Sequence, residues 1–188
     1  MSTQDIFQRM TSALNKAGIA YMLSGSFASA FYGAPRSTQD IDIVIDASPE
    51  QIRSFIQQLP ADDYYSDLAA ALEAHRHQSL FNVIDQASGW KIDFIIRKSR
   101  PFSEEEFRRR TALSLHGVDL FIVTPEDAVL SKLEWAKRAQ SQRQIVDVAA
   151  ILAAQGNSMN RDYLKKWISE LCLNPQWEDA CRLAGIAN

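Results

Sequence analysis

Two carboxylates stand two residues apart at the start of an alternating apolar segment. In residues 40–46 (DIDIVID), isoleucine recurs at every second position, which is the pattern of a β-strand with one buried face. Side chains two residues apart project from the same face of a strand, so we expect Asp40 and Asp42 to lie side by side. Adjacent carboxylates repel each other unless a cation lies between them, and Mg²⁺ prefers oxygen ligands. The spacing indicates either a metal site or a strand whose first polar residues are solvated.

A third carboxylate, Asp93, stands within a later apolar run. The segment 90–96 (WKIDFII) predicts a largely buried strand, in which an unpaired carboxylate would be energetically costly. A cation shared with Asp40 and Asp42 would neutralise Asp93. The alternative is an ion pair between Asp93 and a lysine or arginine.

A glycine turn precedes the first two carboxylates. The apolar run 19–23 (IAYML) predicts a strand, which ends at Ser24-Gly25-Ser26 and is followed by small and aromatic residues typical of a short helix over about 26–33. Ser26 is then near the N-cap. Free backbone N–H groups at such a helix start bind anions and suit phosphate.

This order of strand, Gly-Ser turn, helix and Asp-x-Asp strand resembles the nucleotidyltransferase superfamily that includes DNA polymerase beta. In that superfamily, Gly-Ser and a downstream Asp-x-Asp form the active site, and a third carboxylate stands on a neighbouring strand, as Asp93 would. The segment 33–38 (GAPRST), the run 132–135 (KLEW), the run 141–144 (SQRQ) and Asp147 are similar to a bacterial branch related to AbiEii-type toxin nucleotidyltransferases. The resemblance covers nearly the whole chain.

The resemblance implies a reaction and a metal cofactor. The chain would transfer a nucleoside monophosphate from a nucleoside triphosphate to a hydroxyl-bearing acceptor, which is a protein, a tRNA end or a small molecule. Asp40, Asp42 and Asp93 would be the catalytic carboxylates and the metal ligands. Two Mg²⁺ ions about 4 Å apart are expected, with Mn²⁺ as an alternative.

Four residues are expected to bind the nucleotide. Gly25 permits close backbone approach, and Ser26 with the N–H groups after it holds the β- and γ-phosphates. The AbiEii resemblance suggests that Lys132, in the helix after the sheet, contacts the triphosphate. Arg36 either contacts phosphate or braces the loop before Asp40.

Two other interpretations compete with that of an active nucleotidyltransferase. The chain could be a catalytically inactive nucleotide-binding or partner-binding module, although the presence of the three carboxylates, Gly25-Ser26 and Lys132 argues against this. It could also be the toxin of a toxin–antitoxin pair, with an antitoxin protein as partner. Arg143 and Asp147 stand four residues apart on a predicted helix, and we favour an ordinary surface ion pair over a role in the site.

Composition narrows the class of protein. A chain of 188 residues with 46% hydrophobic residues can bury one substantial core. The net charge of −3 argues against an extended nucleic-acid surface. No apolar run approaches the ~18 residues of a membrane helix and residues 1–5 lack a basic region, so we expect a cytoplasmic protein without membrane association. Cys172 and Cys181 lack metal-binding spacing and are expected to be buried free thiols.

The predicted fold is α/β (α+β): a small mixed sheet with helices on one face, plus a C-terminal helical bundle. Two apolar runs around 85–89 predict a β-hairpin, and residues 113–123 predict a second one. From Thr124 onward the periodicity is helical, with Pro125 at the first helical position. We therefore predict a nucleotidyltransferase core over 1–123 and a C-terminal helical region over 124–188.

Overall fold

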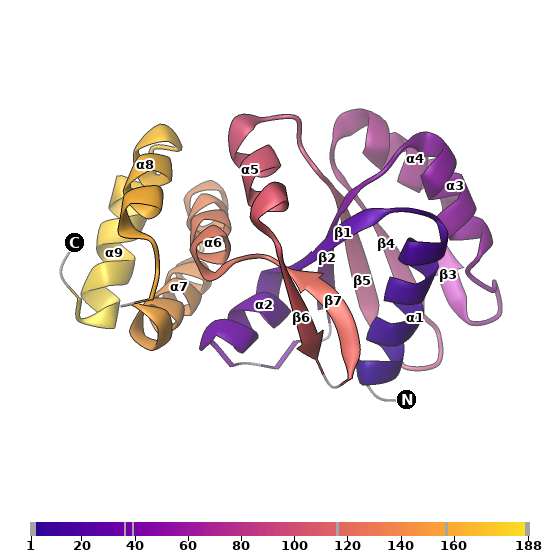
Figure 1. Ribbon diagram of the computed structural model, residues 1–188, viewed down its shortest axis with the longest axis horizontal. Helices are drawn as coiled ribbons and strands as arrows, with labels where there is room; N and C mark the ends of the chain where they lie inside the picture. Colours follow the sequence, from indigo (N-terminus) through magenta and orange to yellow (C-terminus); the bar gives the residue numbers. More distant parts are fainter. Residues whose placement is uncertain (1–2, 36, 39, 116, 157, 187–188) are drawn as a thin grey trace. The chain divides into compact units, whose positions relative to one another are not determined.

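The computed structural model describes residues 3–35, 37–38, 40–115, 117–156 and 158–186 (Figure 1). The strands are β1 (Ala20–Ser24), β2 (Asp40–Asp46), β3 (Tyr64–Ser66), β4 (Leu80–Asp85), β5 (Lys91–Ile96), β6 (Thr111–Leu115) and β7 (Val118–Ile122). The helices are α1 (Thr3–Lys16), α2 (Gly25–Tyr32), α3 (Pro49–Gln57), α4 (Leu68–His77), α5 (Pro101–Arg109), α6 (Pro125–Ala139), α7 (Gln142–Gln155), α8 (Arg161–Glu170) and α9 (Asn174–Ala184).

The strands form one mixed sheet in the order β3-β4-β5-β2-β1-β7-β6. The pairs β2–β5 and β1–β7 are parallel, whereas the other neighbouring strands are antiparallel. Both predicted hairpins, β4–β5 and β6–β7, are present. The mixed sheet with helices confirms the predicted fold class.

Contacts divide the chain into two compact units. The first contains Met1–Ser24 and Thr38–Ile122, and the second contains Gly25–Ser37 and Val123–Asn188. The first therefore holds the sheet with α1, α3, α4 and α5, and the second holds α2 with α6 to α9. The structure differs from the predicted division in the segment 25–37, which groups with the helical unit. Sequence order hides this because α2 lies between two strands of the sheet in the chain.

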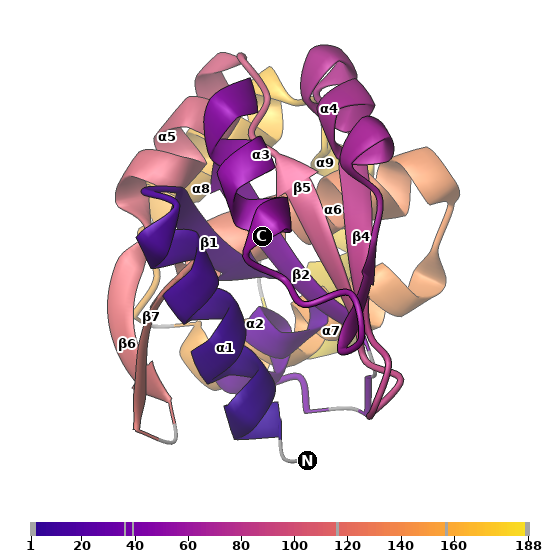
Figure 2. The same ribbon diagram turned by 90° about the vertical axis from the view of Figure 1, so that its right-hand side faces the viewer.

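One face of the sheet carries the core of the first unit. Figure 2 shows α1, α3 and α4 in front of the central strands, and α1 and α4 contact β1 and β4, respectively. The centroid of the Phe94 ring on β5 lies 4.9 Å from the ring centroid of Phe55 on α3 and 5.3 Å from that of Phe81 on β4. Burying one such side chain contributes roughly 1.5–3 kcal/mol, so this cluster fixes the strands that carry the carboxylates.

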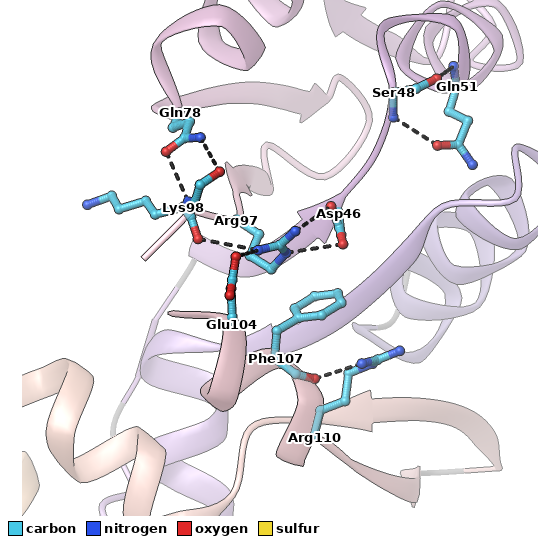
Figure 3. Close-up of polar contacts among 10 residues, drawn as sticks. Asp46, Ser48, Gln51, Gln78, Arg97, Lys98, Glu104, Phe107 and Arg110 are labelled. Carbon is cyan, nitrogen blue, oxygen red and sulfur yellow. Dashed lines mark hydrogen bonds and ion pairs between the residues drawn. The ribbon is translucent and has the colours of Figure 1, made fainter. Parts of the chain in front are cut away.

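Polar contacts hold the ends of the central strands (Figure 3). Arg97 follows β5. Its Nη2 donates to Oδ1 of Asp46 at the end of β2 at 3.2 Å, and its Nε lies 3.1 Å from Oδ2 of the same carboxylate. Such a bidentate pair resists sliding of one strand along the other. Ser48 caps α3 in a full capping box with Gln51, and a proline stands in the first turn of the helix.

The short edge strand β3 has no signal in the sequence. It ends at Ser66, directly before Asp67, which is the N-cap of α4. A three-residue strand is too short to show a period of two. No described helix is long and apolar enough to cross a membrane. Cys181 is buried as expected, but Cys172 is exposed.

The second unit begins with a tight approach of α2 to α7. Gly33 follows α2 with φ +125°, and a Cβ built on it would lie 2.4 Å from the Cβ of Ala154. The Tyr32 hydroxyl donates to the carbonyl of Val123 at 2.7 Å, which ties α2 to the start of α6. Thr124 caps α6, and its side chain accepts from the Asp127 N–H. The helical periodicity predicted from Thr124 is confirmed.

Candidate active site

A row of polar residues crosses four neighbouring strands of the first unit. Asp42 on β2 lies in register with Asp93 on β5 and with Ser24 on β1. Asn82 on β4 lies in register with Asp93. Residues in register project from the same face, and neighbouring strands are about 4.8 Å apart. The fold therefore brings the predicted carboxylates Asp42 and Asp93 side by side, on the face opposite the phenylalanine cluster.

Asp40 starts the next row, and its neighbour in register is Lys91. The Lys91 ammonium lies 3.0 Å from Oδ2 of Asp93 and 3.5 Å from Oδ1 of Asp40. Lys91 thus bridges two of the three carboxylates, and the partner of Asp93 is a lysine, the second of the two alternatives left by the sequence. The hydrogen bond with Asp93 raises the pKa of Lys91 against the effect of burial, and the charges of both carboxylates add to this rise.

The carboxylates differ in exposure. The Asp93 side chain is 13% exposed, whereas that of Asp40 is 56% exposed. Oδ1 of Asp93 is buried and has no hydrogen-bond partner among the described residues. A buried carboxylate oxygen without a donor is unfavourable unless a cation or a donor reaches it.

These residues fit a divalent cation in chemistry, since carboxylate oxygens on rigid strands are the donors that Mg²⁺ prefers. In the described part of the chain, however, no three histidine, cysteine, aspartate or glutamate side chains are placed to hold a metal ion. The Lys91 ammonium contacts one oxygen of Asp40 and one of Asp93, so a metal bound to those two oxygens would require this lysine to move.

The predicted phosphate-binding turn belongs to the second unit. Gly25 is the first residue of α2 and has φ +61°, a left-handed conformation that favours glycine. Ser26 follows in the first helical turn and is half-buried. Gly25 follows Ser24 of the polar row directly in the chain. Arg36 lies outside the described residues.

Lys132 is buried in the second unit and forms an ion pair. Its ammonium lies 2.7 Å from Oδ2 of Asp147 and donates to Oε1 of Gln144 at 3.0 Å. The predicted surface pair of Arg143 and Asp147 is wrong, because Asp147 is buried and Arg143 is exposed. A spacing of four residues places both on one helix but does not show which residue the neighbouring helix covers.

Sequence reasoning missed three members of the polar rows, Ser24, Asn82 and Lys91. Lys91 had a readable signal, because it precedes Asp93 by two residues, as Asp40 precedes Asp42. Ser24 and Asn82 had none, since their place depends on strand register.

Comparison with known proteins identifies the family. Residues 4–179 match the family described as nucleotidyltransferase of unknown function, DUF6036. The chain belongs to this nucleotidyltransferase family. A search of curated proteins finds no match for the DUF6036 chain.

Several solved structures share the fold of this DUF6036 nucleotidyltransferase. An antigenic nucleotidyltransferase-like protein from Paracoccidioides brasiliensis matches with a TM-score of 0.58 and 15% identity, over 95% of this chain and 91% of that one. The antibiotic-resistance factor ANT(2'')-Ia, solved in complex with adenylyl-2''-tobramycin, matches with a TM-score of 0.59 and 10% identity, over 94% and 99%. The lincosamide antibiotic adenylyltransferase LnuA, solved with lincomycin, matches with a TM-score of 0.55 and 12% identity, over 80% and 96%. At these identities the likeness establishes the shared fold.

Proposed function

We propose that this DUF6036 chain is a Mg²⁺-dependent enzyme that transfers a nucleoside monophosphate from a nucleoside triphosphate to a hydroxyl-bearing acceptor. The observation that carries the proposal is the placement of Asp40, Asp42 and Asp93 on one face of two adjacent parallel strands. These strands belong to a chain of a nucleotidyltransferase family. An inactive module could lose such charges freely, and three carboxylates held together are otherwise unfavourable for the fold.

In the proposed reaction, the acceptor oxygen attacks the α-phosphorus and the bond from this phosphorus to the bridging oxygen breaks. Pyrophosphate leaves, and the proton of the acceptor hydroxyl passes to a base. Bound Mg²⁺ would supply charge neutralisation at the α-phosphate and the leaving group. Asp40 and Asp42 would hold the cations. Asp93 would complete the ligand set and is the proposed base.

The nucleotide contacts are proposed for residues of the second unit. Gly25 and Ser26 would present backbone N–H groups at the start of α2 to the β- and γ-phosphates. Arg36 would contact the phosphates or brace its loop. Lys132 would contact the triphosphate, and Asp147, its ion-pair partner, would orient its ammonium group.

The acceptor is proposed to be a small hydroxyl-bearing molecule, with a protein or a tRNA end as alternatives. LnuA is described as an antibiotic adenylyltransferase, and ANT(2'')-Ia was solved with an adenylylated antibiotic. ATP is therefore the first donor to test. An AbiEii-related toxin role is proposed as a second possibility, on the sequence resemblance of the runs that contain Lys132 and Asp147. Growth inhibition that a neighbouring reading frame relieves would support the toxin role.

The test of the proposal is thermal unfolding with ATP, CTP, GTP or UTP, with and without Mg²⁺, for the parent chain and Asp42→Ala. A ligand that binds only the native state raises its stability, by about 2.7 kcal/mol at a hundredfold excess over Kd. We expect a metal-dependent rise in the midpoint with one nucleotide and no rise in Asp42→Ala. An unchanged midpoint with all four nucleotides would contradict the proposal and favour the inactive module.

A further inference from the structure

We propose that Lys91 is an internal counter-ion that holds the carboxylates of Asp40 and Asp93 together until a divalent cation displaces its ammonium group. The inference rests on the proposed function, because it concerns the same carboxylate site. It adds a residue that controls when the metal binds.

The position of Lys91 is the first support. The ammonium contacts Oδ2 of Asp93 at 3.0 Å and Oδ1 of Asp40 at 3.5 Å, so one charge serves two carboxylates on neighbouring strands. A divalent cation at the proposed site would need oxygens of the same two side chains. The Lys91 ammonium already contacts one oxygen of each side chain, and its positive charge repels a cation that approaches them.

The charge balance of the sheet is the second support. Asp42 and Asp93 lie in register on adjacent strands, and Asp40 begins the same strand as Asp42. Like charges on adjacent strands repel each other, and this destabilises the sheet. Without a metal, the Lys91 ammonium offsets part of this repulsion. The chain can therefore fold before it meets a cation.

The mobility that displacement requires is the third support. The Lys91 side chain is 40% exposed, so its flexible stem can turn the ammonium into solvent. Lys132 makes an instructive contrast, because its side chain is 7% exposed and its ammonium is fixed by Asp147 and Gln144. The two lysines thus have different roles, one replaceable and one built in.

If the Lys91 ammonium and a metal ion compete for the same carboxylates, removal of the ammonium should raise the affinity for the metal. The parent chain must break the contacts of Lys91 before a metal can bind, whereas Lys91→Met has no such contacts. We expect Lys91→Met to bind Mn²⁺ about three- to tenfold more tightly, because two partly exposed ion pairs no longer compete. Lys91→Arg keeps the charge and should bind within about twofold of the parent.

The experiment is a titration of the full chain with Mn²⁺, without nucleotide, in which the free ion is measured by electron paramagnetic resonance. Lys16→Met is the matched control, because it removes one positive charge from an exposed residue of α1 in the same unit. It should leave the affinity unchanged. Asp93→Asn should lose most of the binding.

Thermal unfolding of the same variants distinguishes a lysine that a metal ion displaces from a lysine that only stabilises the fold. Lys91→Met should unfold below the parent without metal, and saturating Mn²⁺ should remove most of this difference. A lower midpoint with unchanged Mn²⁺ affinity would make Lys91 a structural brace and overturn the inference.

The titration also separates failure of this inference from failure of the proposed function. Equal affinity in the parent and Lys91→Met, with loss in Asp93→Asn, would overturn the role of Lys91 and leave the carboxylate site standing. Absence of Mn²⁺ binding by every variant at millimolar concentration would overturn both.

Discussion

The buried ion pair of Lys132 and Asp147 allows a prediction whose size follows from the structure. The ammonium and carboxylate lie 2.7 Å apart, and the two side chains are 7% and 6% exposed. Replacing Lys132 by methionine keeps much of the side-chain volume but leaves Asp147 charged and buried. Removing one partner of a buried pair costs about 3–5 kcal/mol. For a chain of 188 residues this corresponds to a lowering of Tm by roughly 6–20 °C.

Urea unfolding, followed by tryptophan fluorescence, measures the loss. Trp167 and Trp177 are buried in the same unit as the ion pair and report on its unfolding. Lys165→Met is the control, because Lys165 is exposed on α8 and its replacement should change stability by less than about 0.5 kcal/mol.

The double variant Lys132→Met/Asp147→Leu tests the cause of the loss. An apolar pair of similar volume often replaces a buried ion pair without loss, so the double variant should regain most of the stability. A midpoint for Lys132→Met equal to that of the parent, or a double variant no more stable than the single one, would refute the reasoning.

Three further predictions concern stability. Gly33→Ala should lower the free energy of unfolding in urea by about 2–4 kcal/mol, because the new Cβ would lie 2.4 Å from the Cβ of Ala154. Gly89→Ala is the control and should lower it by only ~1 kcal/mol, because a Cβ there would have nothing within 4 Å. Equal losses in the two variants would contradict the packing argument. Arg9→Met should cost about 2 kcal/mol, because it leaves the buried Asp85 without its cation, and an unchanged unfolding free energy would count against it. Burial raises the pKa of Asp85, but hydrogen bonds from Ser88 and the charge of Arg9 outweigh it and lower this pKa below 3.8. The ionised Asp85 carboxylate therefore contributes its full stabilisation at neutral pH and loses it as pH falls through the lowered pKa. The stability advantage of the parent over Asp85→Asn should accordingly shrink only below about pH 4.

The elements that carry the site could be predicted from the sequence because their patterns are local. The strand over 40–46 has the predicted bounds, since its alternating isoleucines and paired aspartates leave one arrangement of faces. Asp93 was placed correctly on a second strand for the same reason. The start of α3 was readable from Ser48 and its proline.

The features that the sequence did not reveal depend on contacts between distant segments. Register between β2 and β5 brings Lys91 opposite Asp40, and no local pattern specifies register between strands that are 44 residues apart in the chain. The burial of Asp147 depends in the same way on which face of α7 meets α6. Helix α2 groups with the C-terminal helices although two strands flank it in the chain.

The most direct test of the central claim is a calorimetric titration with analogues of ATP, CTP, GTP and UTP that cannot be cleaved between the α- and β-phosphorus atoms. The parent chain, Asp42→Asn and Asp93→Asn would each be titrated with and without Mg²⁺. The account predicts Mg²⁺-dependent binding of one triphosphate by the parent and a loss of at least tenfold in affinity in both variants, which is ~1.4 kcal/mol or more. Binding that is equal in all three proteins, or that does not depend on the metal, would contradict the claim that these carboxylates form the active site.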